Sequence, residues 1–234
     1  MNARYSLYLA PAPESALWRF GARVLGRDAA SGANVEGYAP EGFSPGAWRA
    51  VAAEPRRYGF HGTLKAPLRL APGRSLDEFE AASEALAAEV APFPLGRLRV
   101  SVLKAGGDLG FVALTPERRS DALAALEARA LVVLDPFRAP PTEAEIARRR
   151  PERLTPRQRD YLAAYGYPYV LEEFRLHFTL SGAVREPEQL AEKIAADFAR
   201  EGEDADFTVD ALALFEQLDG GDFTVRRRIK LGGA

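Results

Sequence analysis

The chain has 234 residues, no cysteine and a net charge of −2 at pH 7. The lack of cysteine excludes disulfides, thiolate nucleophiles, iron–sulfur clusters and cysteine-type zinc sites. A net charge close to zero provides no global basic field for a long phosphate backbone, which disfavours RNA as a partner. Hydrophobic residues at 47% and charged residues at 27% predict a folded globular protein. The lack of a long apolar run predicts a cytoplasmic protein without a membrane segment.

The N-terminal part of the chain begins with regular elements and then loses its periodicity. Alternating Tyr and Leu residues predict a strand over 4–9, and apolar residues on one helical face predict a helix over 15–25. Gly, Ala, Pro and Ser dominate residues 26–55, which predicts a loop with at most a short helix around Trp48.

The first of the two histidines in the chain lies in a predicted strand over 58–70. Successive side chains of a strand point to opposite faces, so His61, Thr63 and Lys65 are expected on one face. Pro67 cannot donate a hydrogen bond to a neighbouring strand, which predicts that the later half of this strand lies at a sheet edge.

A helix, a hairpin and a second helix are predicted next. Ser75 and Glu78 have the spacing of a capping box. The predicted elements are a helix opened by Ser75, a strand over 98–102, a Gly-Gly-Asp turn at 106–108, a strand over 109–114 and a helix over 115–133 with Thr115 as its N-cap.

Residues 134–169 are interpreted as a helical insertion. Thr142 and Thr155 are expected to open two helices, and Gly166 to end the second. The basic runs at 148–150 and 226–228 are interpreted as solvated faces. The insertion also holds a tyrosine cluster, interpreted as packing or as a lid over a substrate: Tyr161, Tyr165, Tyr167 and Tyr169.

The second histidine repeats the first pattern, since His177, Thr179 and Ser181 alternate in an apolar run. The elements predicted after it are a helix from Pro187 to Gly202, a strand over 207–215, a Gly-Gly-Asp turn at 220–222 and a return strand over 223–229. The first glycines of the two turns follow their histidines by 45 and 43 residues.

This order indicates a duplicated β-α-β-β unit. The expected fold is α+β, a single bilobal domain over 1–234 with antiparallel sheets around a central cleft and a pseudo-twofold axis. One lobe is expected at about 26–133, and the other at about 170–234 together with the strand 4–9. The two histidine strands then lie side by side at the centre. An accidental likeness in element order is the alternative.

Two imidazoles facing one cleft can act as general base and general acid, because each has an unperturbed pKa of about 6.5. The hydroxyls of Thr63 and Thr179 are suited to the non-bridging oxygens of a phosphate, and Lys65 can add a positive charge. Core histidines, strand-forming threonines and a solvated lysine are the alternatives. A two-histidine metal site would lack carboxylates at zinc-type spacing, and no cofactor is expected.

The strings His61-Gly62-Thr63-Leu64 and His177-Phe178-Thr179-Leu180 resemble the paired motifs of the 2H phosphoesterase superfamily. The longer strings around them resemble a bacterial branch named for phosphonate metabolism and designated DUF1045. The resemblance implies His61 and His177 as the acid/base pair, and Thr63 and Thr179 as phosphate-binding residues.

The resemblance also implies a metal-independent phosphoesterase that hydrolyses a small cyclic phosphodiester, with a phosphorylated or cyclic-phosphate metabolite as its partner. The insertion at 134–169 distinguishes the chain from the compact RNA-processing members of that superfamily. RNA 2′,3′-cyclic phosphodiesterase or ligase-like RNA end processing is one alternative. A non-catalytic module that binds phosphorylated ligands or RNA ends is the other.

Overall fold

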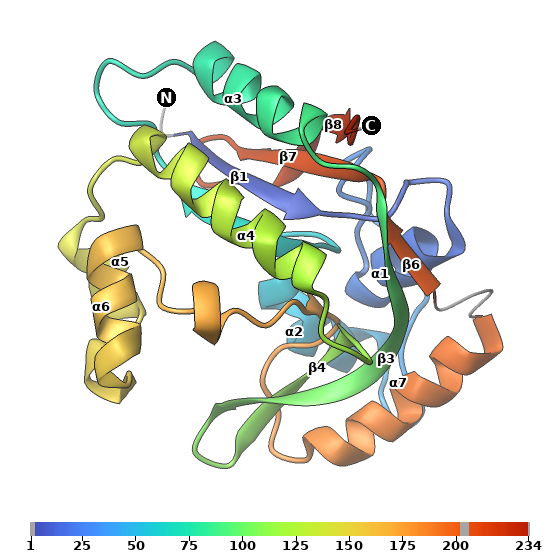
Figure 1. Cartoon of the computed structure of the whole chain (residues 1–234). Coiled ribbons are helices and arrows are strands. Elements are labelled where there is room, and N and C mark those ends of the chain that lie inside the picture. Colours follow the sequence, from blue (N-terminus) through green and yellow to red (C-terminus); the bar gives the residue numbers. More distant parts are fainter. Residues whose placement is uncertain (1–2, 202–205, 234) are drawn as a thin grey trace.

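The computed structural model describes residues 3–201 and 206–233, and within them the chain has an α+β fold. Eight strands in this part form one antiparallel sheet in the order β6-β3-β4-β5-β2-β1-β7-β8 (Figure 1). The strands are β1 (Arg4–Leu9), β2 (Gly62–Leu68), β3 (Phe93–Gly106), β4 (Leu109–Pro116), β5 (Phe178–Thr179), β6 (Asp206–Val209), β7 (Ala211–Gln217) and β8 (Thr224–Lys230). The α-helices are α1 (Ala16–Leu25), α2 (Pro45–Arg56), α3 (Leu76–Ala88), α4 (Asp121–Leu134), α5 (Glu143–Arg148), α6 (Pro156–Tyr165) and α7 (Pro187–Glu201).

The strand order corrects the expected lobes. The strand β2 lies with β1, β7 and β8, whereas β3 and β4 lie with β5 and β6. The predicted strand 207–215 is broken at Asp210, so β6 pairs with β3 and β7 pairs with β1. Each half of the sheet therefore combines strands from both copies of the repeat. The lobes at 26–133 and 170–234 do not correspond to the halves, because strand pairing is a long-range choice that periodicity does not encode.

The central pairing of the sheet agrees with the expected symmetry. The strands β2 and β5 are neighbours and meet at Gly62 and Phe178. The predicted edge at Pro67 is not an outer edge of the sheet, since β2 lies between β5 and β1. The pairing of β2 with the two-residue strand β5 nevertheless involves Gly62 alone.

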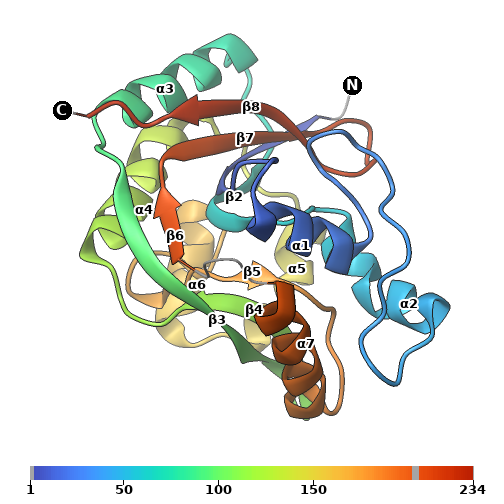
Figure 2. The same cartoon turned by 90° about the vertical axis from the view of Figure 1, so that its right-hand side faces the viewer.

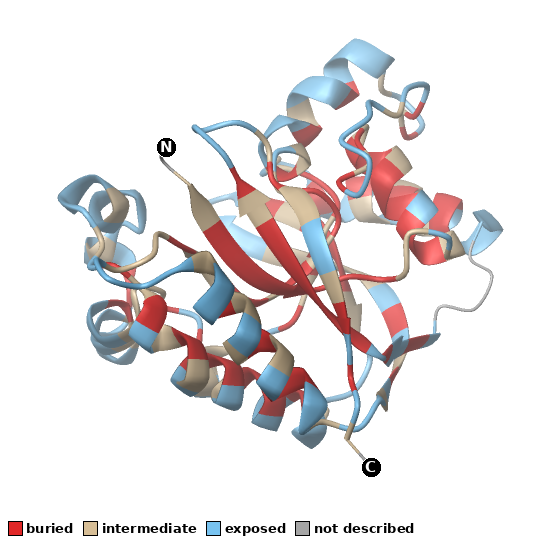
Figure 3. Ribbon diagram, turned by 90° about the horizontal axis from the view of Figure 1, so that it is seen from above, coloured by how far each residue is buried: buried red, intermediate tan, exposed pale blue. Residues whose placement is uncertain are grey.

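Helices cover the two halves of the sheet separately. The helices α3 and α4 pack on each other and on strands of the β2-β1-β7-β8 half, while α7 packs on β3 and β4 (Figure 2). The helices α5 and α6 lie to one side (Figure 1). Buried residues follow the strands and the helix faces turned toward them (Figure 3). None of the helices in the described ranges combines the length and apolarity needed to cross a membrane.

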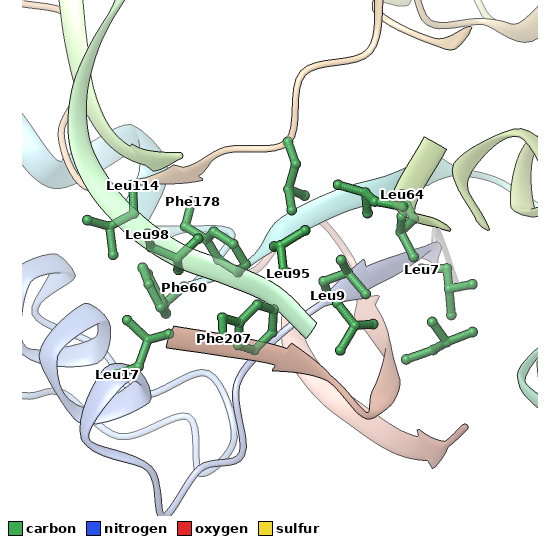
Figure 4. Packing of buried hydrophobic residues seen from close by; sticks show 14 of the residues in the cluster. Leu7, Leu9, Leu17, Phe60, Leu64, Leu95, Leu98, Leu114, Phe178 and Phe207 are labelled. Carbon is green, nitrogen blue, oxygen red and sulfur yellow. The ribbon is translucent and has the colours of Figure 1, made fainter. Parts of the chain in front are cut away.

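Alternation along the central strands separates the main core from the face that carries the motifs. Leu7 and Leu9 of β1 are fully buried in the main core with Leu64 and Phe178 (Figure 4). Tyr8 lies between them in sequence and joins a smaller cluster on the opposite side of the strand. Burial of aliphatic side chains at about 25 cal/mol per Å² makes this register strongly preferred over a one-residue shift.

Local capping signals predicted several helix starts. Capping boxes formed by Ser75 with Glu78, and by Thr142 with Glu145, open α3 and α5. Thr155 also opens α6. The predicted start of α4 at Thr115 is wrong, because β4 continues through Pro116 and Ser120 is the N-cap.

One helix is longer than expected, and one predicted helix end falls outside the described residues. The helix α2 is longer than the short helix predicted around Trp48, which is buried on one of its faces. The stop predicted for α7 at Gly202 lies outside the described residues.

Candidate active site

The two His-x-Thr motifs line one cavity of about 360 Å³ at the centre of the sheet. His61 directly precedes β2 and His177 directly precedes β5. Thr63 and Thr179 follow within those strands and face the same cavity. We call this space the motif cavity. The expectation that the fold brings both motifs together is therefore confirmed.

Gly62 allows the two motif strands to approach closely. A Cβ atom at this position would lie 2.5 Å from Leu176 Cδ1 and 3.3 Å from Phe178 Cζ. A larger residue would force the buried Leu176 side chain, and to a lesser extent Phe178, to shift. Close packing against these side chains thus favours glycine after the first histidine.

Both imidazoles make the same hydrogen bond to the backbone. His61 Nδ1 lies 2.9 Å from the carbonyl oxygen of Gly59, and His177 Nδ1 lies 2.8 Å from that of Arg175. A carbonyl oxygen only accepts, so Nδ1 carries the proton in each neutral ring. The lone pair is then on Nε2, which leaves the second ring nitrogen of each histidine available for proton transfer.

The surroundings favour the neutral form of both rings. Burial, together with the nearby charge that His177 can carry, lowers the pKa of His61 to about 4. Burial also lowers the pKa of His177 below its usual value of 6.5. An imidazole that is neutral at pH 7 can accept a proton, which suits the role of general base.

Each imidazole has an aromatic neighbour from the adjacent strand. The ring of Tyr8 in β1 stacks on His61 at 3.8 Å between centroids, with 22° between the planes. The ring of Phe111 in β4 lies 5.7 Å from His177 and is tilted by 58°. The sheet thus places an aromatic ring beside each histidine, at different distances.

The two threonine hydroxyls are free for a ligand. Among the described residues, neither Thr63 nor Thr179 donates or accepts a side-chain hydrogen bond. Ser181, on the same face as Thr179, differs because its hydroxyl accepts from Val112 N–H and donates to Gly182 O. The Ser181 hydroxyl therefore makes structural hydrogen bonds both as acceptor and as donor.

Lys65 does not line the motif cavity, which corrects its predicted role in substrate binding. The register between β1 and β2 shifts between Thr63, opposite Tyr8, and Lys65, opposite Leu7. This β-bulge ends the simple alternation. The lysine is 3% exposed, and its Nζ lies 2.6 Å from Asp135 Oδ1. Its charge holds the segment after α4 and is not available to a ligand in the cavity.

Several charged and aromatic side chains of the cavity were not among the predicted site residues. They include Arg4, Tyr8, Tyr58, Arg149 and Tyr167. Arg4 and Tyr8 share one face of β1, next to a motif strand. The alternation of side chains along this strand was therefore the sequence pattern that could have identified them. No local sequence pattern placed Arg149 in the site, because a run of basic residues is typical of a solvated surface. Of the four tyrosines between 161 and 169, Tyr167 lines the cavity.

Metal-ligating groups do not gather in the described ranges, where no three His, Asp or Glu side chains are placed to hold one ion.

Sequence comparison matches residues 63–224 to the family described as "Protein of unknown function (DUF1045)". Two curated relatives are both named ribose 1,5-bisphosphate phosphokinase PhnN. The protein of Janthinobacterium sp. (strain Marseille) is 32% identical over 98% of this chain and 51% of its own length. That of Laribacter hongkongensis (strain HLHK9) is 38% identical over 93% of this chain and 49% of its own length. The chain thus spans about half the length of these relatives.

Two solved structures match almost the whole chain at low sequence identity. The protein TT0787 of Thermus thermophilus matches with a TM-score of 0.48 at 17% identity, covering 98% of both chains. LigT of E. coli, complexed with NADP+, matches with a TM-score of 0.45 at 16% identity, also covering 98% of both chains.

Proposed function

The chain belongs to the DUF1045 family, and from its motif cavity we propose that it is a metal-independent phosphoesterase that hydrolyses a small cyclic phosphodiester. One observation carries the proposal. Two imidazoles face a single cavity, each fixed through Nδ1 by a backbone carbonyl and each two residues from a free threonine hydroxyl. General acid/base catalysis needs such paired proton-transfer groups with their orientation set in advance.

The proposed reaction is a hydrolysis in which protons and atoms balance. One histidine accepts a proton from water through Nε2 while the water oxygen bonds to phosphorus. The other histidine, protonated at the start, donates its proton to the ester oxygen as the bond from that oxygen to phosphorus breaks. The product is a phosphomonoester with a free hydroxyl, and proton exchange with solvent restores both rings.

The threonine hydroxyls stabilise the charge that develops during this step. Thr63 and Thr179 project into the cavity from neighbouring strands, one from each motif. Each can donate a hydrogen bond to a non-bridging oxygen of the phosphate, where negative charge grows in the transition state. Donors fixed on strands contribute because they need little reorganisation during the reaction.

The names of the curated relatives point to a substrate class. Both are named as kinases of ribose 1,5-bisphosphate, and this chain matches about half of each. A cyclic phosphodiester that joins O1 of ribose 5-phosphate to a neighbouring hydroxyl would give ribose 1,5-bisphosphate when hydrolysed at the other oxygen. We therefore favour a cyclic phosphate of a pentose phosphate, in phosphonate metabolism, as the substrate. A cavity of about 360 Å³ has the size of a small-molecule site.

The test is a hydrolysis screen in the presence of EDTA. The compounds are ribose cyclic phosphates, with and without a 5-phosphate, and nucleoside 2′,3′-cyclic phosphates. The proteins are the wild type, His61→Ala and His177→Ala, with Lys230→Ala on the exposed face of β8 as the control. We expect turnover by the wild type and by the control, and loss of turnover in both histidine variants. Activity that disappears with EDTA, or that survives either histidine substitution, would contradict the mechanism.

A further inference from the structure

We propose that Arg149 and Tyr167 form a second anion-binding subsite in the motif cavity, which takes a phosphate group of the substrate remote from the one hydrolysed. This inference rests on the proposed function and specifies the substrate class as cyclic phosphates that carry an additional phosphomonoester. Both residues belong to the insertion at 134–169, and both line the cavity that holds the two motifs.

Arg149 is a charged group without a countercharge. Its guanidinium carbon lies 4.8 Å from the centroid of the Tyr167 ring. In the described part of the chain, no carboxylate lies within ion-pair distance of it. The second basic run, at 226–228, differs because each of its arginines pairs with carboxylates. An arginine oriented by an aromatic ring and lacking an acidic partner can offer its donors to a phosphate.

The other charged groups that line the cavity do not provide the anion-binding role proposed for Arg149. Arg4 also lines the cavity, but its Nε donates to Gln217 Oε1 at 2.6 Å and its guanidinium lies 5.4 Å from the Phe223 ring. Glu54 is the one carboxylate among the lining residues, which leaves an excess of positive charge. A negatively charged group of the substrate would balance this excess positive charge.

The insertion is held against the sheet by polar contacts at two places. Arg138 donates to Ala164 O at 2.8 Å and pairs with Asp135, which in turn binds the buried Lys65 of β2. Arg69 donates to Pro140 O at 2.8 Å and pairs with Glu145 of α5. These contacts fix both α5 and the end of α6, so Arg149 and Tyr167 are positioned relative to the motif strands.

Tyr167 directly follows the end of α6. Gly166 ends that helix in the left-handed conformation, at a φ of 69°. A Cβ atom there would lie 3.2 Å from Arg138 Nη1, so glycine also permits the close approach of the anchoring arginine. The anchor and the turn together direct Tyr167 toward the cavity.

The subsite lies on the His61 side of the cavity. Burial raises the pKa of Tyr167 against the charge of Arg149, which lowers it, and the nearby Tyr169 and Tyr58 hydroxyls add smaller upward contributions. The Tyr58 ring is in turn 6.2 Å from that of His61. A substrate that places its second phosphate on Arg149 would therefore extend from the motifs along this tyrosine-lined wall.

The experiment compares two substrates that differ in one phosphate. The probes are the 1,2-cyclic phosphate of ribose 5-phosphate and the 1,2-cyclic phosphate of ribose. Arg149→Gln removes the charge, Arg149→Lys keeps it, and Arg148→Gln is the matched control because Arg148 does not line the cavity. Loss of a charge-assisted hydrogen bond corresponds to roughly 10- to 100-fold in affinity.

For Arg149→Gln we expect KM to rise by about that factor for the phosphorylated probe, with kcat little changed. The KM for the probe without the 5-phosphate should stay within about twofold, Arg149→Lys should retain part of the affinity, and Arg148→Gln should behave as the wild type. Equal effects on both probes, or none on either, would overturn the subsite. A loss of affinity confined to nucleoside 2′,3′-cyclic phosphates would also overturn the subsite, because Tyr167 would then stack on a nucleobase.

Failure of the proposed function can be distinguished from failure of this inference. If the wild type hydrolyses neither probe, the phosphoesterase proposal is wrong. Binding of ribose 5-phosphate, measured by calorimetry, then still tests the subsite. It should be weakened in Arg149→Gln and unchanged in Arg148→Gln, and equal binding by both variants would refute the subsite.

Discussion

The two histidine motifs make the same hydrogen bond to the backbone but have different neighbours. Each ring is fixed by a hydrogen bond from Nδ1 to the carbonyl oxygen two residues earlier. Tyr8 stacks on His61 at 3.8 Å, whereas Phe111 lies 5.7 Å from His177 with a tilted ring. The first motif continues into the seven-residue strand β2 and the second into the two-residue strand β5.

This difference teaches that the duplicated element supplies the proton-transfer groups, while the surrounding elements make the two sides unequal. The His61 side has Tyr8 and Tyr58 beside the imidazole. Such asymmetry is what an acid/base pair requires, since the two groups must be in opposite protonation states at the start of the reaction.

The largest expected effect tests whether the two sides act as one unit. The single variants His61→Ala and His177→Ala should each lower kcat by roughly 10³-fold, because each removes one proton transfer. The double variant should fall little further, since either imidazole alone supports only part of the reaction. The measurement is single-turnover hydrolysis of the preferred cyclic phosphate. Additive losses in the double variant would show that the histidines act independently.

The next effect compares the two threonines. Thr63→Val and Thr179→Val preserve shape and remove one donor each, so kcat should fall by about 10²-fold in both. Steady-state kinetics and thermal melting measure this, and melting temperatures should change little because neither hydroxyl has a partner among the described residues.

Ser181→Ala is the control for the threonine variants. Its hydroxyl bonds Val112 N–H, so this change should lower the unfolding free energy by about 1 kcal/mol while largely sparing kcat. A threonine variant with the kcat of the wild type would remove that residue from the site.

The dependence of rate on pH tests the environment of both rings. Because burial lowers the pKa of His61 to about 4 and lowers that of His177 below 6.5, both are neutral at pH 7. One must be protonated to act as the acid, so kcat/KM should be highest on the acidic side of pH 6.5. It should decrease at higher pH as the acid loses its proton, and below about pH 4 as His61 becomes protonated. A profile from pH 3.5 to 9 measures this, and an optimum above pH 7.5 would contradict it.

The smallest expected effect tests the aromatic neighbours. Tyr8→Leu removes the ring stacked on His61, and kcat/KM should fall by about tenfold, since a well-packed aromatic pair contributes roughly 0.5–1.5 kcal/mol. Phe111→Leu should lower kcat/KM by a smaller factor than Tyr8→Leu, because the Phe111 ring is farther from its histidine, His177. Tyr8→Phe keeps the stacked ring and is the control. Equal losses in the two leucine variants would mean that the difference in packing has no role in positioning.

Much of the local structure could be predicted because it depends on neighbours in the sequence. The capping box of Ser75 and Glu78 is a contact between residues three apart, and the hairpin at 106–108 follows from its glycines. The same holds for the pairs His61/Thr63 and His177/Thr179, since strand alternation fixes which residues share a face. Lys65 was misplaced because a single bulge reverses that alternation.

The sequence by itself determined the two motifs and their duplicated setting, and the adjacency of the motif strands was inferred from that symmetry. Only the tertiary structure decided which strands share each half of the sheet, which aromatic ring meets each histidine, and that Arg149 and Tyr167 reach the motif cavity. Motifs and caps are short-range patterns of hydrogen bonding and alternation. Strand partners and the position of an insertion depend on packing between residues far apart in the chain, such as Lys65 with Asp135, which no local pattern encodes.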